Sequence, residues 1–205
     1  MVVKLFESLL IGASIAAIPG PIFFELIRRT LTVGMRNGVI LVFGEFTANC
    51  ALLSLIFFGV SHFLTDGTVR TILYIVGGCI LFTVSFEALR LTERDIEASY
   101  KSDDTKLERE AFLAGFSISF TNPLLIALWI SLSGSYLNAL NSKSLAFVNI
   151  VLIAFGFLVF FVPLAWVVHK IRHKIPPPRV VLLSRVFGVV LICFGLLLLR
   201  KAAGS

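Results

Sequence analysis

Long apolar segments are the feature that most constrains the fold of this chain. Of its 205 residues, 58% are hydrophobic and 15% are charged, which is not the composition of an ordinary soluble domain. A helix needs about 20 largely apolar residues to cross a bilayer core about 30 Å thick. Six segments meet that requirement: Leu5–Ile27, Val39–Leu64, Val69–Leu89, Ala111–Leu137, Leu145–Val168 and Leu182–Leu199. The sequence therefore predicts an all-α integral membrane protein with six transmembrane helices.

Basic residues gather in alternate connections between these spans. Thirteen of the 18 Lys and Arg residues follow spans one, three and five. The positive-inside rule then places these connections in the cytoplasm and both termini outside, in a multi-pass protein of the inner (plasma) membrane. Because topology explains the basic residues, no nucleic-acid partner is expected. The expected partners are the lipid bilayer and a small-molecule or cation substrate, and a homo-oligomer is left open.

Matches between the two halves of the sequence favour an internal repeat within a single predicted transmembrane domain, residues 1–205. A cytoplasmic linker, residues 92–110, separates repeat one (1–91) from repeat two (111–205). Shifting Glu7–Ile15, ESLLIGASI, by 103 positions lays it over Glu110–Ile118, EAFLAGFSI, and spans three and six agree at a shift of 110. Because each repeat holds three spans, an odd number, the two must lie in opposite orientations. This predicts an inverted 3+3 repeat, which is characteristic of secondary transporters.

Both repeats interrupt their first helix with proline. Pro19, Gly20 and Pro21 stand inside span one, and Asn122 and Pro123 stand at the corresponding depth of span four. An interior proline removes a backbone hydrogen bond and costs a helix about 3 kcal/mol. Irregular backbone is tolerated at this depth only where protein or a water-filled cavity satisfies it. We therefore expect helices one and four to be broken, with the breaks meeting at a substrate cavity; a plain proline kink is the alternative.

Two carboxylates within the spans are further candidates for the site, because ionisable groups in a membrane are costly and usually functional. Glu25 follows Pro21 by one turn and shares its helix face, but it can also form an ion pair with Arg28 or Arg29. Near the end of span three, Glu87 is expected to pair with Arg90.

Glu45 lies deeper, in span two, which contains neither Lys nor Arg. Asn49 follows it by one turn on the same face. Together with Glu25 and Asn122, these two residues are predicted to line one polar cavity. We expect Glu45 to bind and release a proton there.

The chain resembles the LysE/RhtB-type amino-acid exporter family. The resemblance rests on GASIAAIPGP in span one, GMRNGVILVFG beginning at Gly34, GGCILFTVSFEALR in span three and SFTNPLLIALWIS in span four. It covers essentially the whole chain. It implies export of amino acids or related small metabolites, driven by a proton or ion gradient, without ATP or a cofactor. In agreement, the sequence contains no Walker A motif.

The sequence departs from that family at the candidate site. Members commonly carry Gly-Asp where this chain has Ala48-Asn49, and an apolar residue at the position of Glu45. Many also have lysine after the proline of span four, where Leu124 stands here. The alternative function is export of a divalent metal cation, for which Glu25, Glu45, Asn49 and Asn122 offer oxygen ligands. An enzyme is not expected, because neither HExxH nor GxSxG occurs.

Overall fold

The computed structural model describes residues 2–58, 66–99, 105–139 and 143–204, and all regular structure within these ranges is helical. Four helices are each long and apolar enough to cross a membrane: α3 (Met35–Phe57), α5 (Gly67–Arg90), α9 (Lys143–Arg172) and α10 (Pro177–Ala203). The end of the second predicted span, up to Leu64, lies outside the described residues. The all-helical, multi-pass architecture predicted from the sequence is thus confirmed.

The two remaining predicted spans are bent pairs of helices. Helices α1 (Val2–Ala16) and α2 (Pro21–Thr32) meet at 76°, and α7 (Thr105–Phe120) and α8 (Pro123–Ala139) meet at 63°. Each pair together passes the same test of length and hydropathy, so the structure holds up to six spans if each pair counts as one. The predicted breaks in spans one and four are therefore confirmed.

Local chemistry explains where each break falls. Pro21 begins α2, a position that needs no amide donor, and Gly20 before it is extended, with φ −134° and ψ −177°. In span four, Pro123 begins α8, and the Oδ1 atom of Asn122 accepts a hydrogen bond of 3.1 Å from the Leu124 amide. The residues at each break thus provide the start of the helix that follows it.

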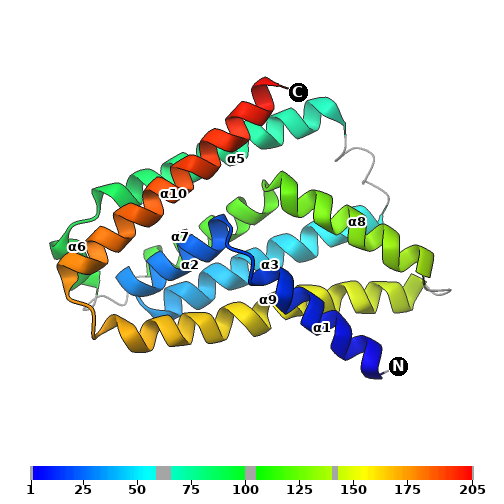
Figure 1. Ribbon diagram of the computed structural model, residues 1–205, viewed down its shortest axis with the longest axis horizontal. Helices are drawn as coiled ribbons and strands as arrows, with labels where there is room; N and C mark the ends of the chain where they lie inside the picture. Colours follow the sequence, from blue (N-terminus) through cyan, green and yellow to red (C-terminus); the bar gives the residue numbers. More distant parts are fainter. Residues whose placement is uncertain (1, 59–65, 100–104, 140–142, 205) are drawn as a thin grey trace.

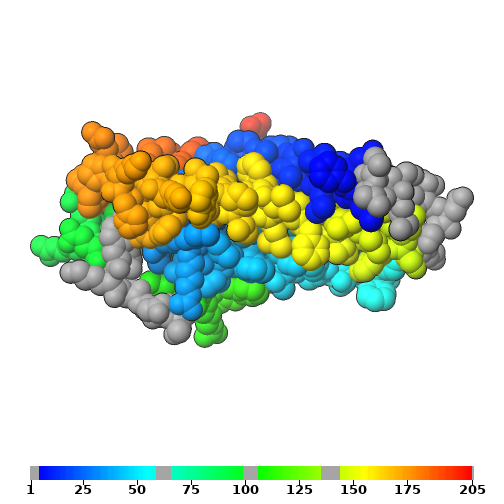
Figure 2. Space-filling view, turned by 90° about the horizontal axis from the view of Figure 1, so that it is seen from below, coloured from blue at the N-terminus to red at the C-terminus, as the bar shows by residue number. Residues whose placement is uncertain are grey.

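The helices pack in three close pairs: α1 on α9, α3 on α7, and α5 on α10. Figure 1 shows both termini toward one end of the molecule and the short helix α6 (Glu93–Ser99) at the other. In the space-filling view of Figure 2, α9 runs along the length of the body between α1 and α3. Both of these neighbours contact α9, so α3 and α9 form the centre of the bundle.

Glycines allow the backbones of two of these pairs to approach closely. A Cβ atom on Gly12 of α1 would overlap the carbonyl oxygen of Ile153 in α9, beside Gly156. In the same way, a Cβ atom on Gly115 of α7 would overlap the carbonyl oxygen of Leu41 in α3. Small residues at such crossings are the usual means of close helix packing in membranes.

Several helices extend beyond the predicted spans, and two helix starts differ most from the sequence prediction. Helix α7 begins at Thr105, inside the predicted linker, because its charged first turns continue the helix beyond the apolar segment; there Glu108 pairs with Arg36 of α3 at 2.8 Å. Helix α10 begins at Pro177 rather than Leu182, since proline is compatible with the first turn of a helix. In the linker itself, α6 is held to the bundle by Ile96, which is fully buried beside Val180.

Candidate transport site

Glu25 lies at the centre of a buried ion-pair cluster in α2. Its Oε2 atom accepts a hydrogen bond of 2.7 Å from Nε of Arg28, and its Oε1 atom accepts one of 2.7 Å from Nη2 of Arg28. The Nε atom of Arg29 donates a further bond of 3.0 Å to Oε1. All three side chains are buried. The ion-pair alternative considered for Glu25 is therefore the arrangement found, and its carboxylate is occupied by two arginines.

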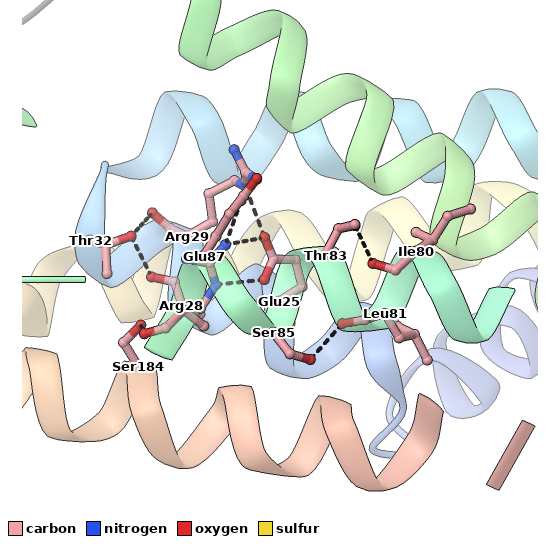
Figure 3. Close-up of polar contacts among 11 residues, drawn as sticks. Glu25, Arg28, Arg29, Thr32, Ile80, Leu81, Thr83, Ser85, Glu87 and Ser184 are labelled. Carbon is pink, nitrogen blue, oxygen red and sulfur yellow. Dashed lines mark hydrogen bonds and ion pairs between the residues drawn. The ribbon is translucent and has the colours of Figure 1, made fainter. Parts of the chain in front are cut away.

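The same cluster joins α2 to α5. Figure 3 shows Glu87 of α5 reaching toward the two arginines, and its Oε2 atom lies 4.0 Å from Nη2 of Arg28. The expected partner of Glu87 was Arg90, but the Arg90 guanidinium lies 3.8 Å from the centroid of the Phe86 ring. That expectation was wrong because tertiary packing places a buried cation of α2 within reach of Glu87.

Glu45 and Asn49 form a second polar group, deep in α3. Their side chains are 2% and 0% exposed. Among the residues that the structure describes, the Oε2 atom of Glu45 and the Nδ2 atom of Asn49 have no hydrogen-bond partner, although the two lie one turn apart. A buried polar atom without a partner costs about 1–3 kcal/mol. Such atoms are therefore candidates for contact with a proton, water or substrate.

Trp129 of α8 completes this group. Its indole Nε1 donates a hydrogen bond of 3.0 Å to Oδ1 of Asn49, and both side chains are fully buried. The sequence analysis did not select Trp129. The available signal was a tryptophan in mid-span, whose indole N–H needs an acceptor when it is buried.

Ser119 of α7 is a further polar residue that the sequence analysis missed. It is fully buried, and its Oγ has no partner within the described part of the chain. Ser119 follows Gly115 by one turn and so shares the helix face that packs on α3. The backbone nitrogen of Glu45 lies at that same crossing, 3.1 Å from where a Cβ atom of Gly115 would be. The spacing of Gly115 and Ser119 was the signal that could have found it.

The residues at the two breaks are less buried than these polar groups. Pro19 is exposed, while Gly20, Pro21, Asn122 and Pro123 are partly buried. Asn122 uses its Oδ1 atom to cap α8, so that atom serves its own helix. The structure thus brings Glu45 and Asn49 together with α8, through Trp129, and it gives Glu25 a separate set of partners in α2 and α5.

The side chains described offer little for a metal ion. Across the described ranges, no group of three His, Cys, Asp or Glu residues is close enough to hold one. Both carboxylate oxygens of Glu25 are already bonded to arginine. Glu45 and Asn49 instead leave one buried acceptor, Oε2 of Glu45, and one buried donor, Nδ2 of Asn49, without a partner among the described residues.

The long helices and bent pairs define a multi-pass helical membrane protein with buried polar groups at its helix crossings. Within that class, the chain belongs to the LysE type translocator family, whose model matches residues 13–202. It is 31% identical over 129 residues to the "Putative amino acid efflux protein YcgF" of Bacillus subtilis (strain 168). That match covers 63% of this chain and 61% of the relative, so it spans less than two thirds of the relative's length. No solved structure is significantly similar to the chain.

Proposed function

We propose that this protein is a secondary active transporter that exports amino acids or related small metabolites in exchange for a proton or another ion. The observation that carries the proposal is a group of buried polar atoms on Glu45, Asn49 and Ser119, near the α3·α7 crossing, that have no hydrogen-bond partner within the described part of the chain. Membership of the LysE type translocator family and the likeness to an efflux protein support export of this class of substrate.

In this proposal the chain is a single domain built as an inverted repeat, with repeat one at 1–91, a linker at 92–110 and repeat two at 111–205. The helix crossings support it. Gly12 corresponds to Gly115 at the offset of 103 residues, and Gly44 corresponds to Gly156 at an offset of 112. The α1·α9 crossing uses Gly12 and Gly156, and the α3·α7 crossing uses Gly115 and Gly44. A pseudo-two-fold axis would exchange these two crossings.

Glu45 is the group we propose for ion coupling. A buried carboxylate that binds a proton on one side of the membrane and releases it on the other would couple proton entry to export. Burial of an unpaired charge is costly, so a proton or a cationic group of the substrate would occupy Glu45 in turn. The breaks at Pro19–Pro21 and Asn122–Pro123 would bound the substrate cavity and supply backbone groups to it.

We further propose that the protein lies in the inner (plasma) membrane with both termini outside. The basic residues favour this orientation, and so does the position of α6 at the end of the molecule away from the termini. Near that end, Lys170 lies 4.2 Å from the ring centroid of Trp166, and Arg90 lies over Phe86. Such pairs of a basic and an aromatic residue suit a membrane–water interface.

A flux measurement with purified protein in liposomes tests the proposal. An imposed proton gradient should drive movement of at least one labelled amino acid, and a protonophore or protein-free liposomes should abolish it. Divalent metal ions, measured in parallel, represent the competing class of substrate. Gradient-driven movement of a metal ion but of no amino acid would contradict the proposal.

A further inference from the structure

We propose that Trp129 is a positioning residue that fixes Asn49 as a hydrogen-bond donor toward the substrate. Asn49 and Glu45 then present a donor and an acceptor, one turn apart on α3, to a molecule that carries an amine and an acceptor oxygen. This inference rests on the proposed transport function and names the groups that would recognise the substrate.

The orientation of the Asn49 amide follows from the chemistry of its partner. The indole nitrogen of tryptophan can only donate a hydrogen bond, so the group that faces it must be the amide oxygen. The distance of 3.0 Å between Nε1 of Trp129 and Oδ1 of Asn49 is that of an ordinary hydrogen bond. With Oδ1 held in this way, the NH₂ group of Asn49 must point elsewhere, and it has no partner in the described structure.

Glu45 supplies the complementary group. Its Oε2 atom is buried and unpartnered within the described residues, and residues four apart on a helix are neighbours, with Cβ atoms about 5–6 Å apart. The amide N–H of Asn49 and the Oε2 atom of Glu45 nevertheless do not bond to each other. Each therefore remains available to a third group placed between them.

The two available groups select the chemistry of the ligand. A carboxylate attracts an ammonium group, and an amide N–H donates to a carboxylate or carbonyl oxygen. A molecule with both groups, on one carbon or on neighbouring carbons, would satisfy both residues at once. An amine without an acceptor oxygen would leave the amide of Asn49 unsatisfied, so the site should discriminate against it.

Trp129 also links this recognition to the broken span. It lies in α8, the part of span four that follows the Asn122–Pro123 break, and its ring packs against Phe157 of α9, with centroids 5.8 Å apart. The hydrogen bond to Asn49 therefore connects α8 with α3 inside the bundle. A movement of α8 that broke this bond would release the Asn49 amide and change the ligand preference of the site.

The test replaces Trp129 with Phe, which keeps an aromatic ring but removes the N–H donor. The chain's other tryptophan gives a matched control, because Trp166 is 47% exposed on α9. In proteoliposomes, Trp129→Phe should raise the KM for a transported amino acid about tenfold. It should also reduce the preference for that amino acid over the amine that lacks its carboxylate. Trp166→Phe should leave the KM and the preference unchanged. In Trp129→Phe, the maximal rate should change less than the KM.

A second variant addresses Asn49 directly. Asn49→Asp still accepts a hydrogen bond from Trp129 but presents an oxygen instead of an N–H, so it should show the same loss of preference. Binding of the amino acid and of the amine can also be measured as the rise in the unfolding temperature of the purified protein. This readout needs no transport. Wild-type flux together with unchanged KM and preference in both variants would overturn this inference alone. A lack of binding and of flux in the wild-type protein would overturn the proposed function with it.

Discussion

Arg28 binds Glu25 through two hydrogen bonds of 2.7 Å, one to each oxygen of the carboxylate. This two-pronged geometry is the strongest form of the pair, and both side chains are buried. Arg29 adds a third bond, so two cations share one buried anion. Glu87, across the α2·α5 contact, lies near enough to Arg28 to compensate part of the excess positive charge. Both oxygens of the Glu25 carboxylate are therefore bonded to arginines of its own helix, and Glu87 links this cluster to α5.

Removal of the central carboxylate should destabilise the protein strongly. Glu25→Gln leaves Arg28 and Arg29 buried without their counter-ion, and such a loss typically costs about 3–5 kcal/mol. We expect a clearly lower unfolding midpoint in detergent, measured by circular dichroism against temperature. Glu7→Gln makes the same chemical change at an exposed position of α1 and should have little effect. Equal midpoints for the two variants would contradict a structural role for the cluster.

The glycine crossings make a second prediction about stability. A Cβ atom on Gly12 would overlap backbone atoms of α9, which cannot move aside as a flexible side chain can. Gly12→Ala should therefore destabilise by at least about 1–3 kcal/mol, the usual range for overpacking. Gly134 of α8 is the matched control, because no neighbouring atom lies within 4 Å of its Cβ position. Gly134→Ala should stabilise slightly, since alanine favours helix. If Gly12→Ala were as stable as Gly134→Ala, the backbones of α1 and α9 could not approach as closely at Gly12 as the structure shows.

Much of the fold could be predicted from the sequence because two of its signals are strong. Apolar segments of about 20 residues identify spans without knowledge of packing, and the prolines at Pro19, Pro21 and Pro123 favour a break in the helix, although α9 continues through Pro163. The contact partner of a side chain could not be predicted in this way. Glu87 pairs with an arginine of another helix, and Asn49 with a tryptophan 80 residues away. Such contacts depend on which helix faces pack together, which one sequence alone does not specify.

The residues of the candidate site also differ in whether the sequence alone identifies them. Glu45 and Asn49 could be selected from the sequence, because a carboxylate and an amide four residues apart are unusual in an apolar span. Ser119 and Trp129 were not selected, since serine is common at helix contacts in membranes and tryptophan is common at membrane interfaces. From the structure, they were selected on their burial and on the presence or lack of a hydrogen-bond partner among the described residues, which depend on the three-dimensional packing.

Membrane orientation gives a third prediction. Single cysteines are introduced into a variant in which the three native cysteines are replaced, and labelling is measured with a reagent that does not cross membranes. Lys174→Cys, exposed in the turn between α9 and α10, should be labelled only from the cytoplasmic side. Gly67→Cys, at the start of α5 with no atom within 4 Å of its Cβ position, should be labelled from the outside. Labelling of both from one side would contradict the proposed topology.

The last prediction separates the two buried carboxylates by the same substitution. Gln has the size of Glu and keeps its polarity but cannot titrate or carry a charge, so Glu45→Gln removes both the proton site and the anion proposed to attract the substrate's ammonium group. Because no charged partner of Glu45 occurs among the described residues, this change should not lower the unfolding midpoint, unlike Glu25→Gln. Amino-acid flux driven by a proton gradient in proteoliposomes should be lost. Any exchange of amino acid across the membrane that remains without the gradient should no longer depend on pH. Glu7→Gln, the exposed control, should keep both properties. If purified Glu45→Gln retained the wild-type rate and pH dependence, Glu45 would not be the coupling group, and its carboxyl would have only a packing role in α3.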